Sequence, residues 1–146
     1  MKVTIKDIVF SIVRLFVIIF VVSCIIYPFS HGVPFIGAPK EKNIAEVKIV
    51  NERLDAEKII TEADGIDYAR KLVNFVNYKI GSGEESEEQG FVTVKYTEKD
   101  GTVTVFSADN TNLYRNGKKY ELADPKTFVL VTEGLFFFGE AVEYEQ

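Results

Sequence analysis

The 146-residue sequence contains one cysteine, one histidine and no tryptophan. A lone cysteine excludes a disulfide framework, and the shortage of cysteine and histidine argues against a zinc site or a nucleophile–histidine pair. Glycine-rich phosphate-binding motifs and a nucleophile elbow are also missing, since the only serine between two glycines is Ser82, in an acidic stretch. The carboxylates of Asp64 and Asp67 are interpreted as solvated helix charges. We therefore expect no catalytic, cofactor-binding or metal-binding residues, and no enzyme.

Charge divides the chain into two parts. Residues 1–27 carry three basic residues and one acidic residue, a net charge of +2. Residues 28–146 carry 14 basic and 21 acidic residues, a net charge of −7. An acidic domain repels phosphate, so nucleic acid is not expected as a partner.

The longest apolar run covers residues 8–27 and includes a single charge, Arg14. About 20 apolar residues are needed to cross about 30 Å of hydrocarbon, and only a helix satisfies a lone backbone segment there. Arg14 lies about 9 Å into such a helix, within reach of the headgroups for a long side chain. The run therefore predicts a membrane-spanning helix, which Pro28 is expected to end.

The flanking charges predict the orientation of this helix. Lys2, Lys6 and Arg14 lie in its N-terminal part, whereas the next basic residue is Lys40. The positive-inside rule then places the N-terminus in the cytoplasm and residues 28–146 outside the cell membrane, with the lipid bilayer as the first partner.

Two processed forms are alternatives to this uncleaved single-pass anchor. A signal peptide could be cleaved near residues 30–32. Alternatively, the sequence Val-Val-Ser-Cys at residues 21–24 resembles a lipobox with Cys24 as the lipidated residue, although Ile25 and Ile26 continue the apolar run. All three readings place the rest of the chain on the same side of the membrane.

The remaining sequence predicts a stalk, one domain and a tail. Residues 28–43 hold three prolines and two glycines, and are expected to form an irregular stalk. Residues 44–139 are predicted to form an extracytoplasmic domain, and residues 140–146 an acidic tail.

Periodicity predicts the first half of the domain. Residues 44–50 alternate as in a strand, and residues 58–60 form a short β-like run. Thr61 is predicted to cap a helix over residues 62–79. Its apolar residues are spaced to form one buried face: Ile66, Ala69, Leu72, Val73, Val76 and Ile80. Residues 81–90 read as a mobile acidic loop without regular structure.

Turn motifs predict the second half. Asp100-Gly101 and Asn116-Gly117 each separate two β-rich runs, as in tight hairpins. Asp124 and Pro125 are predicted to start a final helix, ending at Gly139. The buried face of that helix is expected to contain Phe128, Val131, Leu135 and Phe138. Because three consecutive phenylalanines exceed what one face can bury, Phe136 and Phe137 are candidate partner-contact residues.

The expected architecture is α+β: an N-terminal transmembrane helix, then a small antiparallel sheet of four or five strands with two packing helices, in the order β-α-β-β-β-α. The Thr61-capped helix, the two hairpin turns, Lys118-Lys119-Tyr120 and the Asp124-Pro125-Lys126 helix start resemble those of small membrane-anchored or lipoprotein-like extracytoplasmic domains of unknown function, of Gram-positive type. The resemblance covers most of residues 44–138 and implies no catalytic residues.

Three functions are compatible with this layout. The first is a membrane-tethered binding or sensing module without catalytic machinery, which could bind an envelope protein. The second is a structural accessory subunit that acts through its transmembrane helix within a membrane complex. The third is a secreted or lipidated envelope protein that results from signal cleavage.

The uncleaved anchor makes a prediction about the mature protein. Membrane-extracted protein should have the mass of the complete unmodified chain and an N-terminus at residue 1, measured by intact-mass spectrometry and N-terminal sequencing. A chain that starts at Cys24 and carries added acyl mass, or one that starts near residue 31, would contradict the anchor and select one of the processed forms.

Overall fold

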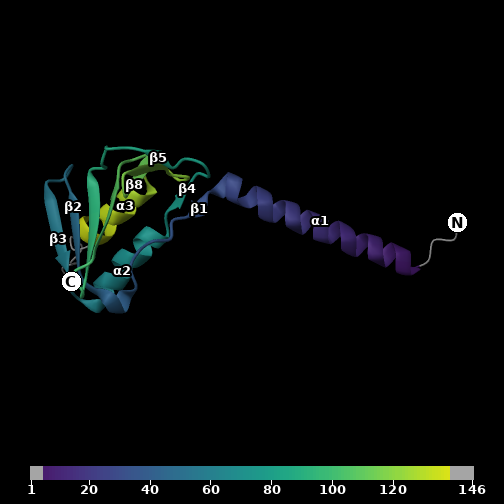
Figure 1. Cartoon of the computed structure of the whole chain (residues 1–146), viewed down its shortest axis with the longest axis horizontal. Helices are drawn as coiled ribbons and strands as arrows, with labels where there is room; N and C mark the ends of the chain where they lie inside the picture. Colours follow the sequence, from purple (N-terminus) through teal and green to yellow (C-terminus); the bar gives the residue numbers. More distant parts are fainter. Residues whose placement is uncertain (1–4, 139–146) are drawn as a thin grey trace, which may run out of the picture.

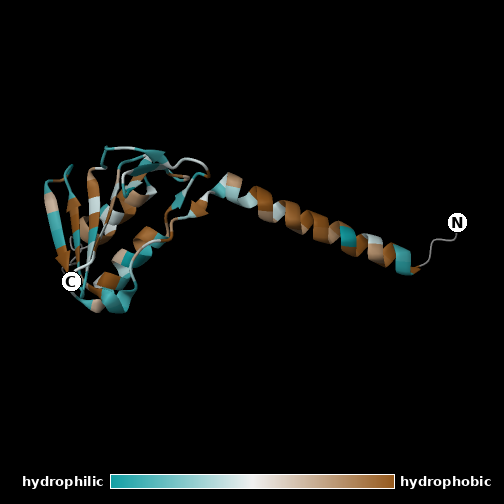
Figure 2. Ribbon diagram, in the orientation of Figure 1, coloured by the Kyte–Doolittle hydropathy of each residue, from teal (hydrophilic) through white to brown (hydrophobic). Residues whose placement is uncertain are grey.

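The N-terminal helix stands apart from a folded α+β domain in the computed structural model, which describes residues 5–138 (Figure 1). Helix α1 (Ile5–His31) has no buried side chain, and the colouring of Figure 2 shows that its residues are mostly hydrophobic. The prediction of an N-terminal apolar helix long enough to cross a membrane is confirmed.

The C-terminal end of α1 differs from the prediction, because Pro28 lies inside the helix rather than after it. The Ser30 hydroxyl donates to the carbonyl oxygens of Ile26 and Tyr27 at 3.2 and 3.1 Å. The rings of Tyr27 and His31 stack with centroids 4.3 Å apart. These local contacts stabilise the last helical turn, although proline cannot donate a backbone hydrogen bond.

The domain is built on one antiparallel sheet of seven strands, in the order β3-β2-β6-β7-β8-β9-β5. Its strands are β2 (Ile44–Asn51), β3 (Ala56–Ile60), β5 (Glu84–Glu85), β6 (Val92–Glu98), β7 (Val103–Ala108), β8 (Asn112–Arg115) and β9 (Lys118–Glu121). A separate two-stranded sheet pairs β1 (Val33–Pro34) with β4 (Asn77–Tyr78). A short 3-10 helix, η1 (Glu41–Asn43), precedes β2. The α+β prediction is confirmed, whereas the expected four or five strands are too few.

Both hairpin predictions are confirmed. Asp100-Gly101 lies in the connection between β6 and β7, and Asn116-Gly117 joins β8 to β9. Gly101, Asn116 and Gly117 have φ angles of 89°, 52° and 71°. Glycine and asparagine tolerate this left-handed region best, which is why these dipeptides occur in tight hairpins.

The acidic loop is more ordered than predicted. Glu84 and Glu85 form β5 and pair with Lys119 and Lys118 of β9, and the carboxylate of Glu88 lies 3.1 Å from the Lys119 ammonium. Opposite charges on neighbouring strands stabilise the pairing. The sequence predicts an irregular loop because its glycines and like charges oppose regular structure, but β9 places two lysines opposite Glu84 and Glu85.

Helix α2 (Ala63–Asn74) buries the predicted face, including Ile66, Ala69 and Val73. It ends earlier than expected, because the chain turns at Phe75 and enters β4, which leaves Ile80 exposed. The residue at its N-cap is Glu62 rather than Thr61, and no side chain caps the first turn.

Helix α3 (Thr127–Glu133) starts later than predicted and continues into one π-helical segment, η2 (Gly134–Phe138). Its N-cap residue is Lys126, whose φ is 71°, rather than Asp124. Of the predicted buried face, Phe128 is buried, whereas Val131, Leu135 and Phe138 are exposed. The buried residues are Phe128, Val129, Thr132, Glu133 and Phe136. Gly139 and the predicted tail lie outside the described residues.

The core lies between the sheet and the two helices, α2 and α3, which both cover one face of the sheet (Figure 1). Alternate residues of the central strand β6, such as Val94 and Tyr96, are fully buried. The Tyr96 hydroxyl donates to the Ala69 carbonyl of α2 at 2.7 Å, and burial raises the pKa of this tyrosine. A hydrogen bond therefore connects the sheet to the helix layer inside an otherwise apolar core.

Asp109 organises the turn between β7 and β8. Its carboxylate accepts hydrogen bonds from the backbone N–H groups of Thr111 and Asn112 at 2.6 and 2.7 Å, and from the Tyr114 hydroxyl at 2.7 Å. Partial burial alone would raise the pKa of Asp109, but these donors favour the charged form and lower it to about 2. Burial, and then the bond to Asp109, raise the pKa of Tyr114 to about 12.

This turn predicts a pH-dependent part of the stability. Because the folded-state pKa of Asp109 lies below its ordinary 3.8, its contribution is complete above pH 3.8 and disappears as the pH falls towards about 2. The substitution Asp109→Asn should lower the free energy of unfolding by about 1–2 kcal/mol at pH 7, because hydrogen bonds to a charged acceptor are lost. The difference from the unaltered protein should shrink at low pH.

Urea denaturation in mild detergent, followed by near-UV circular dichroism at several pH values, measures both effects. Asp64→Asn, at an exposed helix position, is the matched control and should change stability less. Equal stability losses for the two variants at pH 7 would contradict the role assigned to Asp109.

Candidate functional site

The segment predicted as a stalk is partly folded into the domain. Val33 and Pro34 pair with Tyr78 and Asn77, and the Phe35 N–H donates to the Val76 carbonyl at 2.7 Å. The Phe35 side chain is only 5% exposed. The prediction of an irregular stalk over residues 28–43 is therefore wrong at β1 and Phe35. A strand of two residues that pairs with a distant strand has no recognisable pattern in the local sequence.

An aromatic cluster holds this segment in place. The Phe35 ring contacts those of Tyr78, Phe106 and Tyr120 edge to face, with centroids 5.5–5.7 Å apart. The Arg115 guanidinium lies over the Phe35 and Phe106 rings, at 5.6 and 4.9 Å from their centroids. Such contacts add to the energy of burial, so the domain is bound closely to the end of α1.

Gly32 makes the closest approach between the end of α1 and the domain. A Cβ at this position would lie 2.7 Å from both the Ala123 Cβ and the Tyr78 carbonyl oxygen, and the φ of Gly32 is 76°. Only glycine fits both the contact and the backbone conformation. The end of α1 therefore lies directly against β4 and residue 123.

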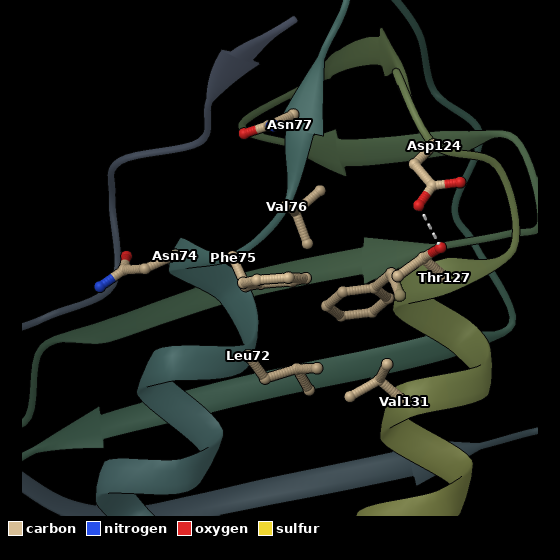
Figure 3. Close-up of a pocket in the computed structure, with 9 residues that line it drawn as sticks. Leu72, Asn74, Phe75, Val76, Asn77, Asp124, Thr127 and Val131 are labelled. Carbon is tan, nitrogen blue, oxygen red and sulfur yellow. Dashed lines mark hydrogen bonds between the residues drawn. The ribbon is translucent and has the colours of Figure 1, made fainter. Parts of the chain in front are cut away.

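An apolar groove of about 350 Å³ lies beside this junction, between the C-terminal end of α2 and the N-terminal end of α3 (Figure 3). We call it the α2–α3 groove. Figure 3 shows Leu72 and Phe75 extending from α2 towards α3, with Val131 facing them. Phe75 is 74% exposed, although it is a large aromatic residue. The lining residues are Leu72, Asn74, Phe75, Val76, Asn77, Asp124, Thr127, Phe128 and Val131.

The ends of two helices create the α2–α3 groove. Helix α2 stops at Asn74, where the chain turns into β4, and α3 starts only at Thr127. The Thr127 hydroxyl donates to the Asp124 carboxylate at 2.6 Å, which places this polar pair at one end of the groove (Figure 3). The groove thus has a mainly apolar lining, to which Asn74 and Asn77 also contribute, and an acidic group at one end.

The α2–α3 groove adjoins the junction with α1 on two sides. Asn77 pairs with Pro34, and the Ala123 N–H donates to the Asn77 carbonyl at 2.9 Å. Ile36, next to the buried Phe35, is 83% exposed. The segment that follows α1 therefore exposes an apolar side chain close to the groove.

The predicted partner-contact residues lie elsewhere. Phe136 is 8% exposed and belongs to the core, and Phe137 is half-buried against it. The exposed apolar side chains of this region are those of Leu130, Val131, Leu135 and Phe138. Phe136 therefore does not present a surface to a partner, because its side chain packs into the core from η2. Cys24, the candidate lipidation residue, is exposed on α1.

Acid–base chemistry gains no support from the carboxylates. Asp67 forms ion pairs with Lys71 and Arg70, and the hydrogen bond from Lys71 lowers its pKa despite some desolvation. Glu133, which is buried, accepts hydrogen bonds from Asn51 and Arg53 and so joins α3 to the end of β2. Within residues 5–138, His, Cys, Asp and Glu side chains form no group of three that could hold a metal ion. Asp67 and Glu133 therefore both take part in contacts within the domain.

Comparisons with protein-family models, with curated proteins and with solved structures gave no match. Function is therefore inferred from the geometry of the chain itself.

The junction predicts a strong dependence of stability on one side chain. Phe35→Ala should lower the free energy of unfolding by about 3–5 kcal/mol, as expected for removing a buried phenylalanine. Ile36→Ala is the control: it removes an exposed neighbour, and should change stability by less than about 0.5 kcal/mol. Urea titration of the full chain in mild detergent gives both values, and similar losses for the two variants would show that Phe35 is not part of the core.

Proposed function

We propose that this protein is a single-pass, membrane-tethered extracytoplasmic binding module without catalytic machinery, and that the α2–α3 groove is its binding site. The observation that carries the proposal is the position of the groove, next to the end of an apolar helix. A site built there meets ligands at the membrane surface.

The length and charge of α1 support the membrane part of the proposal. Its 27 residues extend about 40 Å at 1.5 Å per residue, enough for the hydrocarbon and one headgroup layer. Lys6 and Arg14 lie in the N-terminal half of α1, and Lys40 is the first basic residue after it. This asymmetry favours a cytoplasmic N-terminus and an external domain.

The groove supports the binding part of the proposal. Its volume lies at the lower end of the roughly 300–1,000 Å³ range of small-molecule sites. Its lining is mostly apolar, with a few polar groups at one end, as in sites that bind an apolar ligand and orient it by hydrogen bonds.

A second candidate function is that of an accessory subunit acting through α1 in a membrane complex. The whole surface of α1 is available to other transmembrane helices, since none of its side chains is buried within the described part of the chain. The tight junction at Phe35 would transmit a movement of such a helix to the domain.

Site-directed labelling tests the proposed topology. In a Cys24→Ser background, a cysteine introduced at Ser82 should react in intact cells with a membrane-impermeant maleimide. A cysteine introduced at Thr4, which keeps the flanking charges, should react only after permeabilisation. Labelling of the second variant but not the first in intact cells would show the opposite orientation. Recovery of the unlabelled protein in the soluble fraction would contradict the proposal that α1 anchors the chain in a membrane.

A further inference from the structure

The geometry points to an acyl chain of a membrane lipid as the occupant of the α2–α3 groove. This inference rests on the proposed function, because it requires α1 to span a bilayer. It goes further by naming the ligand: one chain of a lipid drawn from the outer leaflet, with a headgroup that donates hydrogen bonds or carries an ammonium group.

The position of the groove supports this choice. Gly32, which follows α1, contacts Ala123, the residue before the groove residue Asp124. Pro34 pairs with Asn77, which lines the groove on the β4 side. A helix that leaves the bilayer at His31 therefore holds the groove at the level of the headgroups. Lipid is the apolar molecule at highest concentration there.

The apolar lining suits a single chain. Leu72, Phe75 and Val131 extend into the space between the two helices in Figure 3, and exposing the Phe75 ring to water is unfavourable. If each water-sized group needs about 30 Å³, the volume of about 350 Å³ accommodates roughly a dozen chain carbons. This is enough for most of one acyl chain, but not for two.

The polar end selects the headgroup. Asp124 is exposed, and a carboxylate can accept further hydrogen bonds besides the one from Thr127. No lysine or arginine lines the groove. Asp124 therefore favours a headgroup that has an ammonium or hydroxyl group, such as that of phosphatidylcholine, over one whose net charge is negative.

Photo-cross-linking in a defined membrane tests the inference. The full-length protein is reconstituted into phosphatidylcholine vesicles that contain a trace of phosphatidylcholine with a diazirine near the end of one acyl chain. After irradiation, mass spectrometry of the peptides should find lipid adducts on α1, as for any spanning helix. It should also find them on the segments 72–77 and 127–131, which contain most of the residues that line the groove.

Two adjacent residues of α3 provide a matched pair of variants. Val131→Trp fills the groove and should reduce the groove adducts several-fold, while those on α1 stay unchanged. Leu130→Trp adds the same ring at a neighbouring position that is 61% exposed and does not line the groove, so the groove adducts should persist. Phe75→Ser removes an exposed wall of the groove and should also reduce them, without depending on how α3 accommodates tryptophan.

Each further outcome has one meaning. Adducts on α1 but none on the groove peptides would overturn the lipid inference and leave the anchor intact. Absence of adducts on both would contradict the proposed anchoring itself. Groove adducts that Val131→Trp and Phe75→Ser leave unchanged would show contact of the domain surface with the bilayer rather than insertion of a chain, and would overturn the inference.

Discussion

The burial of Phe35 in the core of the domain is the contact on which the arrangement of this molecule depends. It closes an aromatic cluster between β4, β7 and β9, and it fixes β1 against β4 only a few residues after α1 ends. Without it, the domain would follow α1 on a loose tether. With it, the domain has one defined side next to that helix, and the α2–α3 groove lies on this side.

Local sequence signals were sufficient for the elements whose physical causes are local. The Asn116-Gly117 turn requires positive φ angles, which asparagine and glycine adopt readily. The spacing of Ile66, Ala69 and Val73 identifies the buried face of α2. The apolar run that became α1 needs no partner to be recognised. For these features the sequence and the structure agree because the information lies within a few consecutive residues.

Features that depend on distant partners were missed. The pairing of Glu84 and Glu85 with two lysines, and the insertion of Phe35, each join segments more than 30 residues apart. The face of α3 was misassigned because its start at Thr127 and its π-helical end are set by packing. The α2–α3 groove was missed for the same reason. Its single local signal was Phe75, an aromatic residue off the buried stripe of the predicted helix.

Pro28 has a consequence for the way the anchor and the domain move together. Proline cannot donate the backbone bond that a regular helix would form to the carbonyl of Cys24, and sites of this kind are where helices bend. The position at which α1 bends most easily thus lies three residues before its end, close to the docked domain. If α1 spans a bilayer, as proposed, a bend at this point lets the helix tilt to match bilayers of different thickness while the domain keeps the same side towards the lipid.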